Sequence, residues 1–226
     1  MGRLIVLEGL DGCGKSTQLA RLDAYLRESG APYRQISFPD YEQPSSALVR
    51  EYLAGRYGDK PEDVNAYAAS SFYAVDRYAS FKQFWEADYA ADALILAARY
   101  VTSNGIYQMC KLPQSEWDAY LSWLEDYEYD RLGLPRPDEV LFLDMPLKLS
   151  KQLVMSRYQG DSAKKDVHER DDAFMRHCHE AARYMAARQN WTMVPCSADG
   201  QILPMDAITQ DLLQRVSRWL PENGKE

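Results

Sequence analysis

The sequence lacks long hydrophobic runs, since none of its apolar stretches approaches the roughly 20 residues that a membrane-spanning helix needs. Cysteine is scarce, and its four copies show no paired spacing, which argues against a disulfide scaffold and suits a reduced cytosol. An excess of positive charge is also absent, because the formal net charge is −8, which argues against a general nucleic-acid surface. We therefore expect a cytoplasmic protein that binds neither a membrane nor a nucleic-acid polymer.

Internal repeats and low-complexity linkers are absent too, so nothing divides the 226 residues into separate units. The hydrophobic fraction of 46% and the charged fraction of 27% are ordinary for a globular protein. The first predicted strand begins almost at the first residue, which leaves no room for a signal peptide. Val6 stands where a myristoylation signal needs Ser or Thr. We expect one α/β domain over residues 1–226.

Apolar strand patterns alternate with amphipathic helices along the chain. Five strands are predicted, over residues 3–8, 33–38, 93–98, 139–144 and 192–195. The main helices are predicted over residues 17–30, 45–54, 61–86, 103–127 (broken near Pro113), 147–158, about 167–190 and 205–220. Strands that alternate with helices predict a parallel sheet with helices on both faces.

The most specific feature present is a phosphate-binding loop directly after the first strand. The pattern G-x-x-x-x-G-K-[ST] is met by Gly9, Gly14, Lys15 and Ser16. Its glycines let backbone N–H groups point at phosphate oxygens, above the positive end of a helix. Lys15 can reach the β and γ phosphates of a nucleoside triphosphate, and Ser16 can offer a hydroxyl to Mg²⁺. The loop predicts a P-loop NTPase-type three-layer fold and a triphosphate site at Gly9, Leu10, Asp11, Gly12, Cys13, Gly14, Lys15, Ser16 and Thr17.

Five ordered segments resemble the thymidylate kinases, a family of nucleoside-monophosphate kinases, and they extend over most of the chain. They are residues 9–17, Phe38-Pro39, Phe72-Tyr-Ala-Val-Asp-Arg77, Arg99-Tyr100 with Ser103-Asn-Gly-Ile-Tyr-Gln108, and Gly133-Leu-Pro-Arg-Pro-Asp138. The resemblance implies transfer of the γ-phosphoryl group of ATP to the 5′-phosphate of dTMP, giving dTDP, with Mg²⁺ as cofactor. It also implies a homodimer.

The resemblance assigns a dTMP site to eight residues. Tyr73 matches the aromatic that stacks on the base, and Arg77 matches an arginine that contacts the base or the phosphate. Tyr107 would crowd the 2′ position of the sugar, which favours deoxyribose. For Tyr73 and Tyr107, ordinary helix packing is the alternative. The complete predicted site is Asp11, Phe38, Tyr73, Arg77, Arg99, Ser103, Tyr107 and Gln108.

A lid is the second expectation from the resemblance. At Gly12 one branch of the family carries arginine, and in the branch with glycine the basic residues of a lid replace that charge. We therefore expect a lid at about residues 157–170, with Arg157 and the Ser197-Ala198 turn beside the adenine. A solvated surface loop is the alternative for the two lysines there. The predicted catalytic residues are Lys15, Asp11, Arg99, Lys164 and Lys165.

Two polar positions depart from the family pattern. Ala98 replaces the aspartate that usually precedes Arg99, and Asp40-Tyr41 occupies the place of a phosphate-gripping arginine. These changes leave open a catalytically impaired nucleotide-binding homologue with a regulatory role, or a shifted acceptor among the nucleoside monophosphates. A deoxynucleoside kinase is a further alternative, with Asp40 or Glu42 as the base.

Two other patterns predict structure more than chemistry. His177-Cys178-His179 resembles a metal-ligand cluster, but adjacent helical residues point in different directions and cannot all face one ion. An aromatic stripe is expected to pack in the core, or else to form an exposed patch that pairs two subunits. It consists of Trp117, Tyr120, Trp123 and Tyr127.

Overall fold

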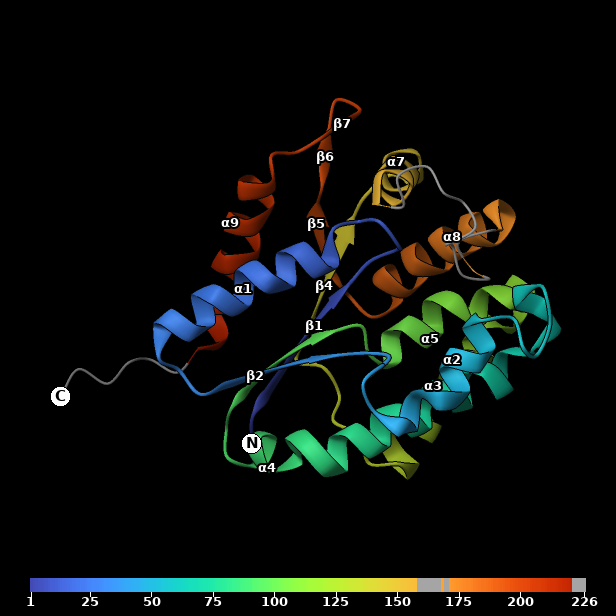
Figure 1. Cartoon of the computed structure of the whole chain (residues 1–226), viewed down its shortest axis with the longest axis horizontal. Helices are drawn as coiled ribbons and strands as arrows, with labels where there is room; N and C mark the ends of the chain where they lie inside the picture. The colour runs from blue at the N-terminus through green and yellow to red at the C-terminus, as the bar shows by residue number, and fades with distance from the viewer. Residues whose placement is uncertain (158–167, 169–170, 221–226) are drawn as a thin grey trace.

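A computed structural model of the chain, which describes residues 1–157, 168 and 171–220, has a five-stranded parallel sheet at its centre (Figure 1). The strands are β1 (Arg3–Glu8), β2 (Tyr33–Ser37), β3 (Leu94–Ala98), β4 (Glu139–Asp144) and β5 (Thr192–Pro195). Their order in the sheet is β2-β3-β1-β4-β5. The predicted parallel sheet of five strands is confirmed.

Helices of different lengths cover this sheet. The α-helices are α1 (Lys15–Ser29), α2 (Ala47–Leu53), α3 (Ala66–Ser80), α4 (Glu86–Ala90), α5 (Val101–Tyr107), α6 (Trp117–Glu125), α7 (Leu147–Arg157), α8 (Asp172–Arg188) and α9 (Met205–Val216). Two π-helical turns are η3 (Phe81–Trp85) and η6 (Asp126–Arg131). Short 3-10 turns are η1 (Pro44–Ser46), η2 (Pro61–Asp63), η4 (Met109–Lys111), η5 (Gln114–Glu116) and η8 (Ser217–Trp219).

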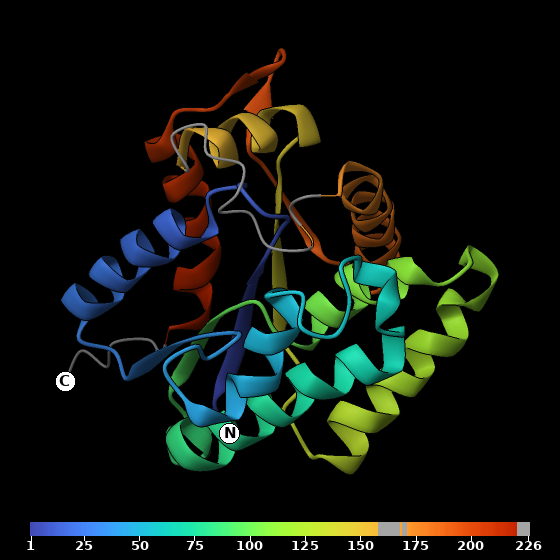
Figure 2. The same cartoon turned by 45° about the vertical axis from the view of Figure 1, so that its right-hand side comes forward.

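The two faces of the sheet build two separate hydrophobic cores. Ile5 and Leu7 of β1 pack into the core under α1 and α9, and Leu4 and Val6 pack into the core under α5 and α8. Figures 1 and 2 show α1 and α9 on one side of the sheet and α3, α5 and α8 on the other. Because both faces are covered, the strands read as continuous apolar runs rather than alternating ones.

Parallel pairing brings the ends of three strands to one edge. In the register between β1 and β3, Leu7 lies beside Ala98, and β2 places Ser37 beside Ala98 on the other side. The loops that leave these strands therefore start close together, although they are far apart in the sequence. Such a carboxyl edge is where open α/β sheets bind their ligands.

Two local predictions need correction. The helix predicted over residues 61–86 begins only at Ala66, because the Asn65 side chain accepts the Ala68 N–H at 2.9 Å and caps the helix there. It then passes through the π turn η3 into α4. A small antiparallel hairpin, β6 (Ser197–Ala198) and β7 (Gln201–Ile202), follows β5 and was not predicted as strands.

The aromatic stripe is part of the core, as its spacing predicts. Trp117 and Tyr120 are buried and Trp123 packs against the same cluster, which confirms core packing for these three residues, while Tyr127 is partly exposed. Cys178 is buried on α8 while its neighbour His177 is exposed, as diverging helical directions require. Within the described ranges no group of three or more His, Cys, Asp or Glu side chains could hold a metal ion. No described helix is both long enough and apolar enough to span a membrane.

Candidate active site

The phosphate-binding loop leaves β1 and enters α1 at the carboxyl edge of the sheet. Gly14 caps α1 with a left-handed backbone (φ 93°), and the first helical hydrogen bond runs from the Gln18 N–H to the Gly14 carbonyl. The N–H groups of Lys15, Ser16 and Thr17 precede that bond, so the helix itself does not use them. The Ser16 and Thr17 side chains are exposed. This is the geometry of a helix N-terminus that binds an anion.

Lys15 closes the loop on itself. Its Nζ donates hydrogen bonds to the carbonyl oxygens of Gly9 at 2.6 Å and Leu10 at 2.9 Å. Burial lowers the pKa of the Lys15 ammonium, and the nearby charge of Arg99 lowers it further. The ammonium therefore stands in a place where a phosphate oxygen would be a better partner than two neutral carbonyls.

Gly12 is held tightly against α7. A Cβ at this position would lie 2.5 Å from the Ser150 carbonyl oxygen and 2.7 Å from a Val154 methyl group, and the backbone is left-handed (φ 79°). An arginine at this position cannot be accommodated unless α7 moves. Lys164 and Lys165, predicted to replace its charge, lie outside the described residues, as does the side chain of Arg157.

Asp11 joins the loop to the segment after β3. Arg99 Nη2 donates to Asp11 Oδ1 at 2.5 Å, and the Tyr107 hydroxyl donates to Asp11 Oδ2 at 3.0 Å. Burial of the carboxyl acts to raise its pKa, but the charges of Arg99 and Lys15 outweigh burial, so the pKa lies below the usual range. Asp11 is ionised, and it holds the Arg99 guanidinium at the mouth of the loop.

Glu8 is a buried carboxylate beside Arg99 that the sequence reasoning missed. It ends β1 fully buried, and its Oε1 accepts hydrogen bonds from Thr102 Oγ1 at 2.6 Å and Ser103 Oγ at 2.8 Å. Ser103 Oγ in turn accepts from Arg99 Nη1 at 3.4 Å. Glu8 thus supports Arg99 from one side and Asp11 supports it from the other. The arginine is held in place without an aspartate at position 98.

One cavity of about 100 Å³ opens beside this cluster. The structure brings all eight residues of the predicted dTMP site to its wall: Asp11, Phe38, Tyr73, Arg77, Arg99, Ser103, Tyr107 and Gln108. Five more residues line it that were not predicted for the site: Pro39, Tyr41, Leu53, Asn104 and His168. Asp40 and Glu42, weighed above as a catalytic base, are not among the lining residues, and the backbone N–H of Asp40 donates to Asp76 at 2.8 Å.

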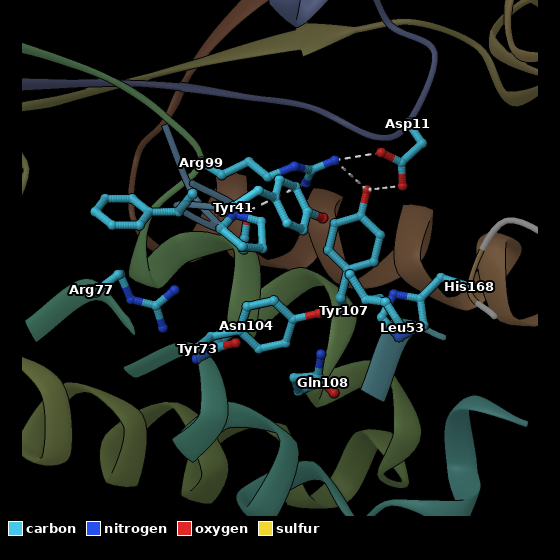
Figure 3. A pocket seen from close by; sticks show the side chains of 13 residues that line it. Asp11, Tyr41, Leu53, Tyr73, Arg77, Arg99, Asn104, Tyr107, Gln108 and His168 are labelled. Carbon is cyan, nitrogen blue, oxygen red and sulfur yellow. Dashed lines mark hydrogen bonds and ion pairs between the residues drawn. The ribbon is translucent and has the colours of Figure 1, made fainter. Parts of the chain in front are cut away.

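The cavity has two ends of different chemistry, shown in Figure 3. We call Asp11, Arg99 and the Tyr107 hydroxyl its charged end. We call Tyr73, Arg77, Asn104 and Gln108 its buried end.

Arg77 at the buried end is neutralised by a carboxylate from a distant helix. Its Nε and Nη2 donate to Glu128 Oε2 at 2.7 Å and Oε1 at 2.5 Å, and both side chains are at most 1% exposed. Burial acts to lower the pKa of Arg77, but the charge of Glu128 outweighs it, so the pKa is raised. Gln108 is also buried, and its Oε1 has no hydrogen-bond partner within the part of the chain that the structure describes.

His168, which belongs to the segment predicted as a lid, lines the cavity. Its ring stacks on Tyr107 (centroids 5.7 Å apart, planes at 12°), and its Nε2 lies 2.8 Å from the Tyr52 hydroxyl, which also accepts from Lys111 Nζ at 2.8 Å. Burial, and then the charge of Lys111, lower the pKa of His168 to about 3, so the ring is neutral. A single histidine in a polar stretch carries no sequence signal, which is why this residue was missed.

Comparison with known proteins agrees with the geometry. Residues 7–202 match the family described as thymidylate kinase. A thymidylate kinase of Mycobacterium tuberculosis is 32% identical over 190 residues, which cover 83% of this chain and 87% of that protein. One from Synechococcus sp. (strain CC9311) is 28% identical over 222 residues, covering 97% and 99%. The solved thymidylate kinase from Candida albicans has the same fold, with a TM-score of 0.69, 22% identity and coverage of 96% and 92%.

Proposed function

The chain belongs to the thymidylate kinase family, and on that premise we propose that it transfers the γ-phosphoryl group of ATP to dTMP, giving dTDP and ADP. The observation that carries the proposal is the cavity beside the phosphate-binding loop. Eight side chains that come from separate segments and were assigned to dTMP by resemblance line this one space. A loop that binds a donor phosphate and a cavity that binds an acceptor are what such a transfer requires.

The buried end suits a neutral pyrimidine base. Since Glu128 already neutralises Arg77, the remaining N–H groups of Arg77 are better matched to a carbonyl oxygen than to a phosphate. The unpartnered Oε1 of Gln108 accepts a hydrogen bond, and the N3–H of thymine is a donor of the right kind. Tyr73 offers an aromatic face for stacking. Carbonyl, N–H and ring together fit thymine better than cytosine.

The charged end suits the acceptor phosphate. Arg99 and Lys15 are the cations nearest to Asp11, and they lie where two phosphate chains would meet. In the transfer, the bond between the γ-phosphorus and the oxygen that bridges to the β-phosphate breaks, and ADP leaves with its electron pair. An oxygen of the dTMP phosphate forms the new bond. This oxygen is already anionic near pH 7, so the step needs no general base, only charge neutralisation and alignment.

Mg²⁺ fits the residues present. The Ser16 hydroxyl is exposed at the first turn of α1, and oxygen is the ligand that this ion prefers. Magnesium keeps several waters and takes substrate phosphates as ligands, so a single protein hydroxyl is a sufficient anchor. Bound there, the ion would neutralise charge on the β and γ phosphates.

The lid remains part of the proposal. We assign the missing positive charge beside Gly12 to Lys164 and Lys165 and the adenine contact to Arg157. The close approach of α7 to Gly12 supports this, because the loop itself has no room for an arginine. The impaired homologue is disfavoured, since Glu8 and Asp11 already orient Arg99 beside Ala98. We treat residues 1–226 as one domain, because all described strands except the β6-β7 hairpin belong to one sheet.

A homodimer is proposed through the outer face of α3. Tyr67, Val75 and Tyr78 are each about two-fifths exposed and lie on one side of this helix. Burying them against a second copy would remove apolar surface from water. Light scattering after size exclusion should give twice the monomer mass, and Val75→Asp should reduce it; a monomeric wild type would contradict the proposal. A cytoplasmic location is also proposed, from four cysteines that are all free thiols.

A coupled assay of ADP release tests the kinase proposal. With ATP and Mg²⁺, dTMP should give the highest kcat/KM among the nucleoside monophosphates, and thymidine should give no turnover. Gln108→Leu should lower kcat/KM for dTMP by about tenfold, because it removes one hydrogen-bond acceptor from a buried contact. Robust turnover of another acceptor without turnover of dTMP, or nucleotide binding without any turnover, would contradict the assignment.

A further inference from the structure

Glu128 is a fully buried carboxylate that the sequence analysis did not assign to either substrate, and it is 51 residues from Arg77 along the chain. It lies in the π turn η6, directly after α6, and is 0% exposed. It does not line the cavity, but it accepts hydrogen bonds from two side chains that do. Arg77 Nε and Nη2 bind its two oxygens at 2.7 and 2.5 Å, and Asn104 Nδ2 binds Oε1 at 2.9 Å.

The bidentate pair fixes the orientation of the Arg77 guanidinium. A guanidinium has five N–H groups in one plane, and this pair uses two of them. The other three then have set directions, since the plane can no longer rotate. A long arginine side chain without such a partner would have many rotamers, and ordering it on binding would weaken affinity.

Asn104 is fixed by the same carboxylate. Its Nδ2 donates to Glu128 Oε1 and also to the Ser70 carbonyl at 3.2 Å, so the amide donors are used and its side-chain oxygen is turned away from them. The Tyr120 hydroxyl donates to the backbone carbonyl oxygen of Asn104 at 3.3 Å and lies 2.5 Å from Ser70 Oγ. Burial raises the pKa of Tyr120 and Tyr129, both of which lie near Glu128. The surroundings of Glu128 are therefore poor in water. In such surroundings an ion pair is strong and holds its geometry.

We propose that Glu128 is a positioning residue for recognition of the acceptor base. It fixes the Arg77 guanidinium so that the remaining N–H groups of Arg77 can donate to a carbonyl at position 4 of a pyrimidine, and it engages the Asn104 amide donors. It also cancels the Arg77 charge, so that this end of the cavity rejects a phosphate. The inference rests on the proposed function, because it concerns how dTMP is chosen and not whether phosphate is transferred.

The test compares Glu128→Gln with wild type on dTMP and on 5-methyl-dCMP, which differs from dTMP in carrying an amino group at position 4 and no proton at N3. Glu128→Gln keeps the size of the side chain but removes its charge and one acceptor oxygen. We expect the KM for dTMP to rise at least about tenfold and the preference for dTMP over 5-methyl-dCMP to fall by a similar factor, as loss of a charged hydrogen bond implies. The KM for ATP should stay unchanged.

Two further variants keep the test decisive. Glu128→Asp retains the charge but draws the carboxylate back by one methylene, and it should show a smaller rise in the KM for dTMP in a protein that folds. Asp126→Asn is the matched control, since Asp126 lies in the same π turn but is about half exposed and pairs with Arg131 at the surface. It should behave as wild type.

A purely structural role would give a different pattern. In that case the Glu128 variants would lose melting temperature and kcat while keeping the wild-type KM for dTMP and the wild-type preference, and the inference would be overturned. Failure of the proposed function is visible separately, as a wild-type protein that does not turn over dTMP, and it would overturn this inference as well.

Discussion

Arg77 and Arg99 line the same cavity, yet their surroundings differ in almost every respect. Arg77 is 1% exposed and forms a bidentate pair with Glu128. This ion pair brings no net charge to the cavity. The Arg99 side chain is 18% exposed, and one nitrogen pairs with Asp11 while Lys15 lies nearby. At the buried end the arginine is therefore enclosed by a bidentate ion pair, whereas at the charged end the arginine keeps a partly exposed face.

The same residue type can therefore serve two kinds of recognition. A neutralised arginine in a dry site offers directed N–H groups, which select the shape and hydrogen-bond pattern of a base. An arginine with a partly open face can gain a phosphate as a further partner and stabilise charge in a transition state.

The largest expected effect is on stability, at the buried end. Arg77→Met leaves the Glu128 carboxylate buried and unpaired, which costs about 3–5 kcal/mol of unfolding free energy. The double variant Arg77→Met/Glu128→Leu should recover most of this loss, because neither charge is then left alone. Urea unfolding of the two variants measures both quantities. A loss below about 1 kcal/mol in the single variant, the value typical of a surface pair, would show that the pair is not buried in solution.

The next effect is on turnover, at the charged end. Arg99→Met should lower kcat for dTMP by about 10²–10³-fold, as removal of a charged donor from a transition state does in other enzymes. Stability should change less than in Arg77→Met, since Arg99 is partly exposed. Steady-state kinetics at saturating ATP and dTMP gives the number. Arg136→Met, which removes an exposed arginine with surface partners, is the control and should leave kcat unchanged. An equal kcat in Arg99→Met and Arg136→Met would show that Arg99 does not contribute to phosphoryl transfer.

A third effect is the pH dependence of stability that the buried, neutral ring of His168 predicts. His168 has a pKa of about 3 in the folded protein, set by burial, Lys111 and Arg99 against Asp11, and a value near 6.5 when unfolded. Between these values the unfolded chain binds more protons, so stability falls as pH drops below about 6.5. At pH 5 this group alone should cost about 2 kcal/mol relative to pH 7.

His168→Gln should flatten that slope, and His177→Gln, which changes an exposed histidine of α8, should keep it. Urea unfolding at pH 7, 6 and 5 measures the three proteins. Equal slopes in wild type and His168→Gln would mean that His168 is not buried as a neutral ring.

The smallest effect concerns the family aspartate that is missing before Arg99. Because Glu8 and Asp11 already orient Arg99, Ala98→Asp should change kcat by no more than about threefold, the effect of one further carboxylate beside a paired cation. The coupled assay at saturating substrates decides this. A tenfold gain would show that the missing carboxylate limits turnover and that Glu8 does not replace it.

The comparison also shows how far residue patterns could reach. Asp11, Tyr73, Arg77, Arg99 and Gln108 were predicted from motifs and resemblance, and the structure gathers them around one cavity. Their partners Glu8, Glu128 and His168 were not predicted. Glu128 is 51 residues from Arg77, and Thr102, which donates to Glu8, is 94 residues beyond it. No local pattern encodes such pairs, because each member looks like an ordinary residue of its own helix or strand.

The phosphate-binding loop, the five parallel strands and the family could be recognised from the residue pattern alone. These depend on local geometry, since a glycine-rich turn between a buried strand and a helix can be read from adjacent residues. The enclosure of Arg77 by a bidentate carboxylate and the partly exposed face of Arg99 depend on the tertiary structure. That outcome depends on which carboxylates the packing of α6, η6 and β1 brings to each arginine, and on how much water the fold leaves there.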